Sequence, residues 1–348
     1  MPEVYVGPIA ALYEVYKDEL KGESELLAAL SSHAPQRAKS LGAGRALLKY
    51  ALRHHGLLDQ GALLPPLVLG RLGKPSLQWP QGSRGCGWDF NLSHSNGLLA
   101  LSLGQGAMGI DLELCALKRL TPMLLNKILD PAERRICALL GATSYTASRG
   151  DPSVRAGWVT RGTSAGGVCA GGYLQPAEET PLTAEQLMVQ MPNDEEAQEL
   201  YSAAWQKLLC PKTLRPIQRQ SIWWTQQWTL RECVLKILGQ SIFAYDQLTL
   251  DVHNLSIKMA GLPQGTVHCV ALRTQDYLDI SSSVRAPAPC ELAVTENEMQ
   301  WVLSVFVPEG DSLQLKLWNG QNWSNFDGSA LCTYHSGAHV AQRLDPLL

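Results

Sequence analysis

The sequence has no long apolar run, and its apolar segments fall short of the roughly 20 residues that a helix needs to span a bilayer. Its first residues lack a basic region followed by an apolar stretch, the pattern of a secretory signal peptide. These absences favour a cytoplasmic protein without a membrane partner. The sequence also lacks a large excess of either positive or negative charge. The 29 Lys and Arg against 32 Asp and Glu give a net charge of −3, which argues against a broadly basic nucleic-acid binder.

The nine cysteines include no Cys-x-x-Cys pair, so neither a zinc site nor a redox dithiol is indicated. Their odd number and wide spacing favour reduced thiols that are mostly packed in the interior. With 348 residues, 45% of them apolar and 18% charged, the chain is long enough for two domains or for one large domain with insertions.

Hydrophobic periodicity predicts helices and strands in alternation along the chain. The predicted helices cover residues 23–29, 37–54, 127–140, 194–209 and 221–238. The predicted strands cover residues 4–11, 67–69, 98–103, 108–114, 248–259, 267–274, 291–295 and 301–307. Residues 141–182 break this pattern, because they are rich in Gly, Ser, Thr and Ala, and they predict a long flexible insertion. The tail, residues 313–348, contains strand-like pieces to which no role is assigned.

Asp111 and Glu113 lie two positions apart in a predicted strand, so their carboxylates face the same side while Ile110 and Leu112 face the core. Two such oxygen donors suit Mg²⁺, which binds few carboxylates and completes its shell with water and phosphate oxygens. The alternative is an ordinary amphipathic strand with an acidic outer face.

On the predicted helix 221–238, Trp228, Glu232 and Lys236 follow one another at four-residue intervals on one face. A carboxylate and an ammonium placed together suit a phosphate-bearing site. The alternative is a surface salt bridge between Glu232 and Lys236 along the helix.

Ser93, His94 and Ser95 are consecutive, and neighbouring residues of a strand point to opposite faces, which argues against a Ser-His nucleophilic relay. Hydroxyl and imidazole groups that grip a phosphate fit better. The alternative is a polar turn before a strand.

Residues 104–109 (GQGAMG) match the glycine pattern of a dinucleotide-binding loop. That loop requires a helix to begin at its later glycines, whereas the residues that follow alternate with the period of a strand. A tight hairpin between two strands is the better interpretation.

Five segments, in this order, resemble the motifs of the 4′-phosphopantetheinyl transferase superfamily, and in particular its larger monomeric type that activates peptide, polyketide and siderophore synthetases. They are residues 44–48 (GRALL), 73–75 (GKP), 90–95 (FNLSHS), 109–113 (GIDLE) and 228–236 (WTLRECVLK).

The resemblance implies an α+β fold of two similar halves related by a pseudo-twofold axis, each a small antiparallel sheet with a long helix, and an active site between them. It divides the chain into an N-terminal half that binds coenzyme A (1–107), a C-terminal half with the metal and the catalytic helix (108–310, including the insertion at 141–182), and an extension (311–348). The implied reaction transfers 4′-phosphopantetheine from coenzyme A to a serine of an apo acyl or peptidyl carrier protein. Adenosine 3′,5′-bisphosphate leaves, and the enzyme is expected to be a monomer.

The resemblance also implies roles for individual residues. Asp111, Glu113 and Glu232 match the ligands of Mg²⁺, and Glu232 also matches the general base. Lys236 matches a lysine that contacts phosphate and for which protonation of the leaving group is a further implied role. The positions that match coenzyme A contacts are Arg45, Lys74, Ser93 and His94.

Two features depart from the family pattern. Arg231 stands where a lysine is usual, and a guanidinium does not replace an ammonium at a fitted phosphate. The interval between Glu113 and Trp228 is also much longer than is typical. Two other functions are weighed against the transferase: a non-catalytic relative that binds carrier proteins, and an oxidoreductase of the Rossmann type. The intact acidic residues and Lys236 argue against the first, and the strand after residue 109 argues against the second.

Overall fold

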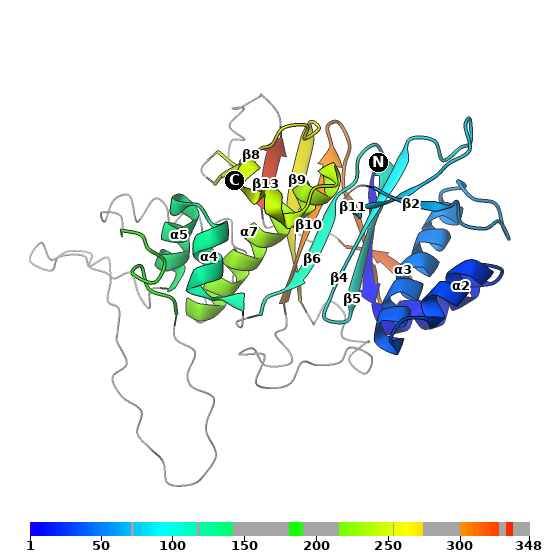
Figure 1. Cartoon of the computed structure of the whole chain (residues 1–348), viewed down its shortest axis with the longest axis horizontal. Helices are drawn as coiled ribbons and strands as arrows, with labels where there is room; N and C mark the ends of the chain where they lie inside the picture. The colour runs from blue at the N-terminus through cyan, green and yellow to red at the C-terminus, as the bar shows by residue number, and fades with distance from the viewer. Residues whose placement is uncertain are drawn as a thin grey trace, which may run out of the picture. The chain divides into compact units, whose positions relative to one another are not determined.

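The structure is a computed structural model that describes residues 1–70, 73–116, 119–141, 181–190, 216–252, 254–273, 300–326 and 332–336. Within these residues the chain has a mixed α+β structure with three β-sheets (Figure 1), which confirms the predicted mixed class. Most of the predicted insertion, the predicted helix 194–209 and the predicted strand 291–295 lie outside the described residues.

Most predicted elements are present, with boundaries shifted by a few residues. The described helices are α1 (Ile9–Tyr16), α2 (Ser24–Ser31), α3 (Pro35–His54), α4 (Pro122–Ile128), α5 (Pro131–Gly141) and α7 (Pro216–Leu238), with the 3-10 helices η1 (Lys17–Leu20) and η3 (Ile242–Gln247). The described strands are β1 (Glu3–Pro8), β2 (Leu67–Leu69), β3 (Pro75–Leu77), β4 (Trp88–Ser95), β5 (Leu98–Gln105), β6 (Ile110–Leu114), β7 (Thr249–Asp251), β8 (Ser256–Lys258), β9 (Gly265–Arg273), β10 (Gln300–Pro308), β11 (Gln314–Trp318), β12 (Trp323–Asn325) and β13 (Cys332–Ser336).

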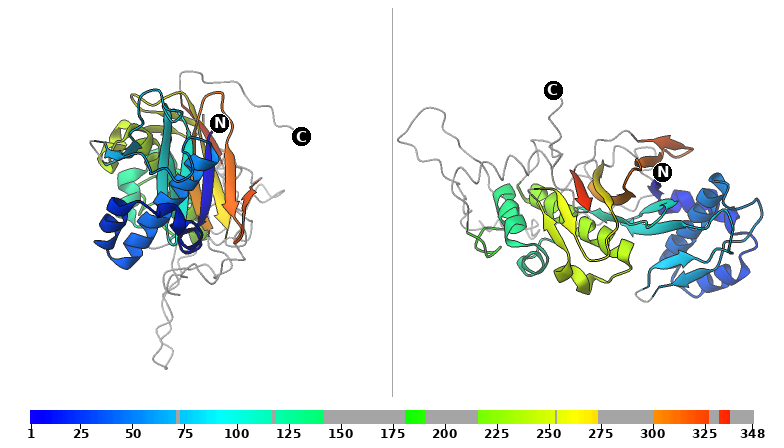
Figure 2. Two further views of the ribbon diagram at one scale, coloured as in Figure 1. Left: turned by 90° about the vertical axis from the view of Figure 1, so that its right-hand side faces the viewer. Right: turned by 90° about the horizontal axis from the view of Figure 1, so that it is seen from above.

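The first sheet has the strand order β12-β11-β1-β5-β4. Figure 2 shows the helices α1 to α3 gathered on one side of this sheet. Strands β4 and β5 form a hairpin whose turn is Asn96-Gly97, both with positive φ (45° and 85°), as a two-residue hairpin turn requires. Ser93 and Ser95 therefore lie within a strand and not in a polar turn.

The tail supplies two strands of this first sheet. β11 pairs with β1, and β12 pairs with β11. They bring Trp318 and Trp323 to an aromatic cluster, in which the Trp323 ring lies 5.0 Å from that of Tyr5 and its Nε1 donates a hydrogen bond to the Tyr16 hydroxyl at 2.7 Å. Residues 314–325 are therefore part of the sheet that begins at the N-terminus.

The second sheet has the order β6-β10-β9-β13-β8-β7, and α7 packs against it. Buried residues of α7, among them Leu230, Val234 and Ile237, form one apolar cluster with Val267 and Phe306 of the sheet. This cluster anchors the helix that carries the candidate catalytic residues.

The small antiparallel sheets that were expected are in fact mixed, because each of these two sheets contains one parallel pair among the described strands, β1 with β11 and β8 with β13. Both pairs join segments that are far apart in the sequence. A long connection allows a strand to enter a sheet in either direction, whereas a hairpin does not.

The helix predicted over residues 127–140 is in fact two helices. Pro131 disfavours a helical backbone at the residue before it, and α5 begins with a capping box in which the Asp130 side chain accepts a hydrogen bond from the Glu133 N–H and Glu133 accepts one from the Asp130 N–H. Leu129, at the end of α4, is extended.

The chain divides into two compact units, residues 1–114, 228–286 and 300–348 in the first and residues 115–227 and 287–299 in the second. In the second unit the Gln220 amide donates hydrogen bonds to the carbonyl groups of Cys137 and Leu182. The predicted halves at 1–107 and 108–310 have other limits and stay a prediction. All residues of the pocket described next belong to the first unit.

Candidate functional site

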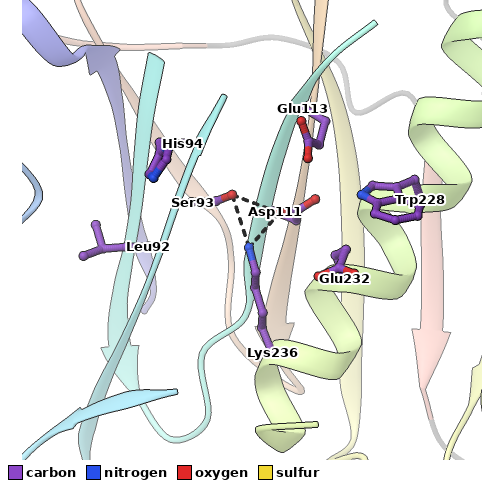
Figure 3. A pocket seen from close by; sticks show the side chains of 8 residues that line it. All are labelled: Leu92, Ser93, His94, Asp111, Glu113, Trp228, Glu232 and Lys236. Carbon is purple, nitrogen blue, oxygen red and sulfur yellow. Dashed lines mark hydrogen bonds and ion pairs between the residues drawn. The ribbon is translucent and has the colours of Figure 1, made fainter. Parts of the chain in front are cut away.

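Three segments of the chain meet at a pocket of about 300 Å³ between β4, β6 and α7 (Figure 3). Six of the eight predicted site residues line it, together with Leu92 and Trp228. Its lining residues are Leu92, Ser93, His94, Asp111, Glu113, Trp228, Glu232 and Lys236.

β4 contacts β6 through serine hydroxyl groups. Ser93 and Ser95 lie two positions apart and share one face of β4. The Ser93 hydroxyl accepts a hydrogen bond from the Leu112 N–H at 3.2 Å, and the Ser95 hydroxyl accepts one from the Leu114 N–H at 3.1 Å. These hydroxyl groups take the place of strand pairing and join the edge strand of one sheet to the edge strand of the other.

The same hydroxyl groups hold the two carboxylates of β6. Ser93 donates a hydrogen bond to Asp111 Oδ1 at 2.9 Å, and Ser95 donates one to Glu113 Oε2 at 2.8 Å. Leu112, between them, is fully buried. The alternation predicted from the sequence is present, and it directs both acids to the pocket.

Gly109 lets the beginning of β6 approach α7 closely. A Cβ atom at this position would lie 2.6 Å from the carbonyl oxygen of Cys233 and 2.3 Å from Cγ1 of Ile237. No side chain fits in this space, which explains the glycine that precedes the acidic strand.

α7 presents Trp228, Glu232 and Lys236 to the pocket from successive turns (Figure 3). The Lys236 ammonium lies 2.6 Å from Asp111 Oδ1 and donates to the Ser93 hydroxyl at 3.2 Å. In the part of the chain that the structure describes, its ion pair is thus with Asp111 across the pocket and not with Glu232 on its own helix.

Burial and neighbouring charges shift the pKa values of Glu232 and Lys236, the two ionisable residues that α7 contributes to the pocket. Burial opposes the charge of Lys236, but the Asp111 carboxylate outweighs this effect and raises the pKa of the lysine. Burial raises the pKa of Glu232, a hydrogen bond from Tyr245 opposes the shift, and the negative charge of Asp111 adds to it. Lys236 is therefore a cation at neutral pH, and Glu232 holds a proton more readily than an exposed glutamate does.

His94 and Leu92 extend from the side of β4 opposite to Ser93, as Figure 3 shows. Loss of water around the ring and the positive charge of Lys236 lower the pKa of His94. Its imidazole is therefore neutral at neutral pH and offers both a donor and an acceptor.

Arg45 and Lys74 do not line this pocket. Lys74 donates to Asp89 Oδ2 at 2.7 Å and to the Met108 carbonyl oxygen at 3.2 Å. Arg45 lies on α3, and its Nη1 is buried without a hydrogen-bond partner in the described structure. Burial lowers the pKa of Arg45.

The residues fit a Mg²⁺ ion that arrives with a phosphate-bearing ligand. Among the described residues, no three His, Cys, Asp or Glu side chains lie close enough together to hold a metal alone. Asp111 Oδ2, however, is buried without a hydrogen-bond partner in the described structure. Glu113 and Glu232 border the same space (Figure 3). Mg²⁺ takes one or two carboxylates and completes its shell with water and phosphate oxygens.

Residues 104–109 do not form the expected hairpin. β5 and β6, which they connect, belong to different sheets. The N–H groups of Leu112 and Leu114 bond to serine hydroxyl groups, and β6 pairs with β10 instead. A strand follows Gly109, so the helix that a dinucleotide-binding loop requires is absent at this position.

Two residues that contact the site received no role of their own from the sequence. Ser95 was noted only as part of the Ser93–Ser95 segment, although its two-residue spacing from Ser93 was a usable signal. Tyr245 lies on η3, and its hydroxyl donates a hydrogen bond to Glu232 Oε1 at 2.6 Å. Nothing in the local pattern around Tyr245 marks this contact.

No family model matches the chain, and no curated protein matches it. A search of the described helices finds none that is both long and apolar enough to cross a membrane.

Proposed function

We propose that the chain is a 4′-phosphopantetheinyl transferase, which moves the 4′-phosphopantetheine group of coenzyme A to a serine of an apo acyl or peptidyl carrier protein. The observation that supports this most is the convergence of distant motifs. Residues 109–113 and 228–236 are far apart in the sequence, yet polar side chains from both segments line one pocket together with Ser93 and His94.

In the proposed reaction, the carrier serine oxygen forms a bond to the β-phosphorus of coenzyme A. The bond from that phosphorus to the bridging oxygen breaks, and adenosine 3′,5′-bisphosphate leaves with the electron pair. The serine proton passes to Glu232, whose raised pKa suits a base that must accept a proton from a hydroxyl group.

Lys236 acts as a fixed positive charge in this proposal. The second pKa of a phosphate monoester is about 6, so the leaving group departs without first receiving a proton. The raised pKa of Lys236 keeps its ammonium charged, which favours contact with phosphate oxygens over proton donation.

Mg²⁺, when bound, neutralises charge on the pyrophosphate. Asp111 and Glu113 are the residues that would hold it, with Glu232 on the facing helix. Ser93 and Ser95 orient the two β6 carboxylates through one oxygen each. Coenzyme A would extend from the pocket along the N-terminal half of the chain, on the side where His94 lines the pocket. The pseudo-twofold relation of the halves belongs to the same proposal.

The direct test is mass spectrometry of a panel of apo carrier proteins after incubation with the protein, coenzyme A and Mg²⁺. A mass increase by one phosphopantetheine group is expected. Asp111→Asn and Glu232→Gln should each lower the rate at least about 100-fold, because each loses a charged ligand facing a pyrophosphate. Asp18→Asn, which changes an exposed carboxylate on η1, is the matched control.

An unchanged transfer rate for Asp111→Asn at limiting Mg²⁺ would show that Asp111 is not a ligand of the metal. Stable complexes with apo carriers but no mass increase would favour the non-catalytic carrier-binding relative instead.

A further inference from the structure

Tyr245 reaches the site because α7 ends in a sharp reversal. The Gln240 N–H bonds to the Leu235 carbonyl at 2.8 Å, and the Gly239 N–H bonds to the Lys236 carbonyl at 3.3 Å, the pattern of a Schellman cap. Gly239 has φ of 60°, which favours glycine. The chain then folds back into η3 and places Tyr245 beside the last turns of the helix.

Tyr245 contacts two pocket residues without lining the pocket itself. Its hydroxyl donates to Glu232 Oε1 at 2.6 Å. Its ring meets the Trp228 ring edge-on, with centroids 5.8 Å apart and planes at 65°. The tyrosine therefore binds Glu232 through its hydroxyl and packs its ring against Trp228, one turn earlier on α7.

This contact differs in kind from an ion pair. A neutral hydroxyl orients one oxygen of Glu232 without cancelling the negative charge, and the second oxygen stays available to the pocket. Burial and the adjacent Glu232 charge raise the pKa of Tyr245, so the hydroxyl keeps its proton and remains the donor.

We propose that Tyr245 is a positioning residue for Glu232: it holds the carboxylate so that its free oxygen meets the hydroxyl proton of the carrier serine. This inference rests on the proposed transferase function. The competing role is purely structural, in which Tyr245 only fastens η3 to α7.

The test is Tyr245→Phe in the full chain, because phenylalanine keeps the ring against Trp228 and removes only the hydroxyl. We expect kcat to fall about tenfold while KM for coenzyme A stays unchanged. Tenfold corresponds to about 1.4 kcal/mol, close to what one hydrogen bond to a charged group contributes. Tyr13→Phe on α1, far along the chain from the site residues, is the matched control and should keep the wild-type rate.

A purely structural role would instead lower the melting temperature and leave kcat of the folded enzyme unchanged, which would overturn the proposal. The midpoint of urea unfolding for Tyr245→Phe, Glu232→Ala and the double variant gives a readout that does not need activity. We expect non-additive shifts, so that Tyr245→Phe has no further effect once Glu232 is alanine. Additive shifts would show that the two side chains do not interact.

This cycle also separates the two hypotheses. If the wild-type protein modifies no carrier but the shifts in the urea midpoint are non-additive, the proposed function is wrong while the interaction between Tyr245 and Glu232 is confirmed. If transfer occurs and the shifts are additive, the positioning role alone fails.

Discussion

At the scale of residues, hydroxyl groups hold the acids of the pocket. Each carboxylate accepts a hydrogen bond from one hydroxyl: Asp111 from Ser93, Glu113 from Ser95 and Glu232 from Tyr245. Such donors fix orientation and preserve negative charge, which a site for a cation requires. Asp111 also pairs with Lys236, so a bound cation and this ammonium would share its two oxygens.

Lys74 and His94 are both predicted contacts of coenzyme A, but their surroundings differ. Lys74 is paired with a partly buried Asp89, whereas His94 borders the pocket. Lys74→Met should lower the free energy of unfolding by about 2 kcal/mol, because it leaves Asp89 without its cation. His94→Ala should leave stability near wild type and raise KM for coenzyme A about fivefold, the loss of one hydrogen bond.

Urea unfolding and steady-state kinetics on the same two variants check this. A stable Lys74→Met variant with a selectively raised KM for coenzyme A would show that Lys74 leaves Asp89 to bind the ligand.

At the scale of elements, α7 serves the core and the site at once. Leu230 and Val234 are fully buried against the second sheet, while Glu232 and Lys236 reach the pocket. Close packing at Gly109 sets the distance between this helix and β6. After the helix ends, the chain returns towards Glu232, so α7 and the turn that follows it position Glu232, Lys236 and Tyr245 together.

The residue that ends α7 is therefore expected to be sensitive to substitution. Gly239→Ala should cost about 1 kcal/mol of stability, because alanine disfavours the positive φ at this position. Gly239→Asn should cost less, since asparagine tolerates this conformation. Thermal unfolding of both variants gives the measurement. If the alanine variant were as stable as the wild type, the left-handed conformation of residue 239 would not be needed to end the helix.

At the scale of the whole molecule, the first strand of the chain, β1, and two strands from the tail, β11 and β12, share the first sheet. Glu3 on β1 accepts hydrogen bonds from Lys316 on β11 at 2.8 Å and from Tyr5, and it lies 3.1 Å from His55 after α3. One partly buried carboxylate thus links an N-terminal strand, a strand from the tail and the end of a long helix.

This cluster predicts loss of stability in acid. Burial alone would raise the pKa of Glu3, but Lys316 and Tyr5 lower it below its ordinary value of 4.5. Burial lowers the pKa of His55 from 6.5, against the charge of Glu3. In both cases the unfolded chain binds more protons, so the stabilisation is complete above the ordinary value and is lost as the pH falls through the folded value.

Unfolding free energies measured from pH 7 down to pH 2.5 should therefore decrease, and Glu3→Gln should flatten the part of the curve below pH 4.5. A variant whose curve parallels that of the wild type over this range would exclude Glu3 as the source.

The sequence by itself determined the features that depend on local pattern. Helical periodicity predicted α3 and α7 and the residues at which they end, although the helices begin two and five residues before their predicted starts at 37 and 221. The two-residue alternation placed Asp111 and Glu113 on one face of β6. These features follow from the geometry of one helix or one strand, which neighbouring residues largely decide.

Only the tertiary structure decided which elements meet. The joining of β4 to β6 through serine hydroxyl groups, the parallel entry of β11 beside β1 and the approach of Tyr245 to Glu232 all pair segments whose local patterns carry no mark of their partner. The same holds for Lys74, which pairs with Asp89 outside the pocket. Such contacts depend on how sheets and helices pack to bury apolar surface and satisfy polar groups. That packing is determined by all elements of the chain together and not by any one segment.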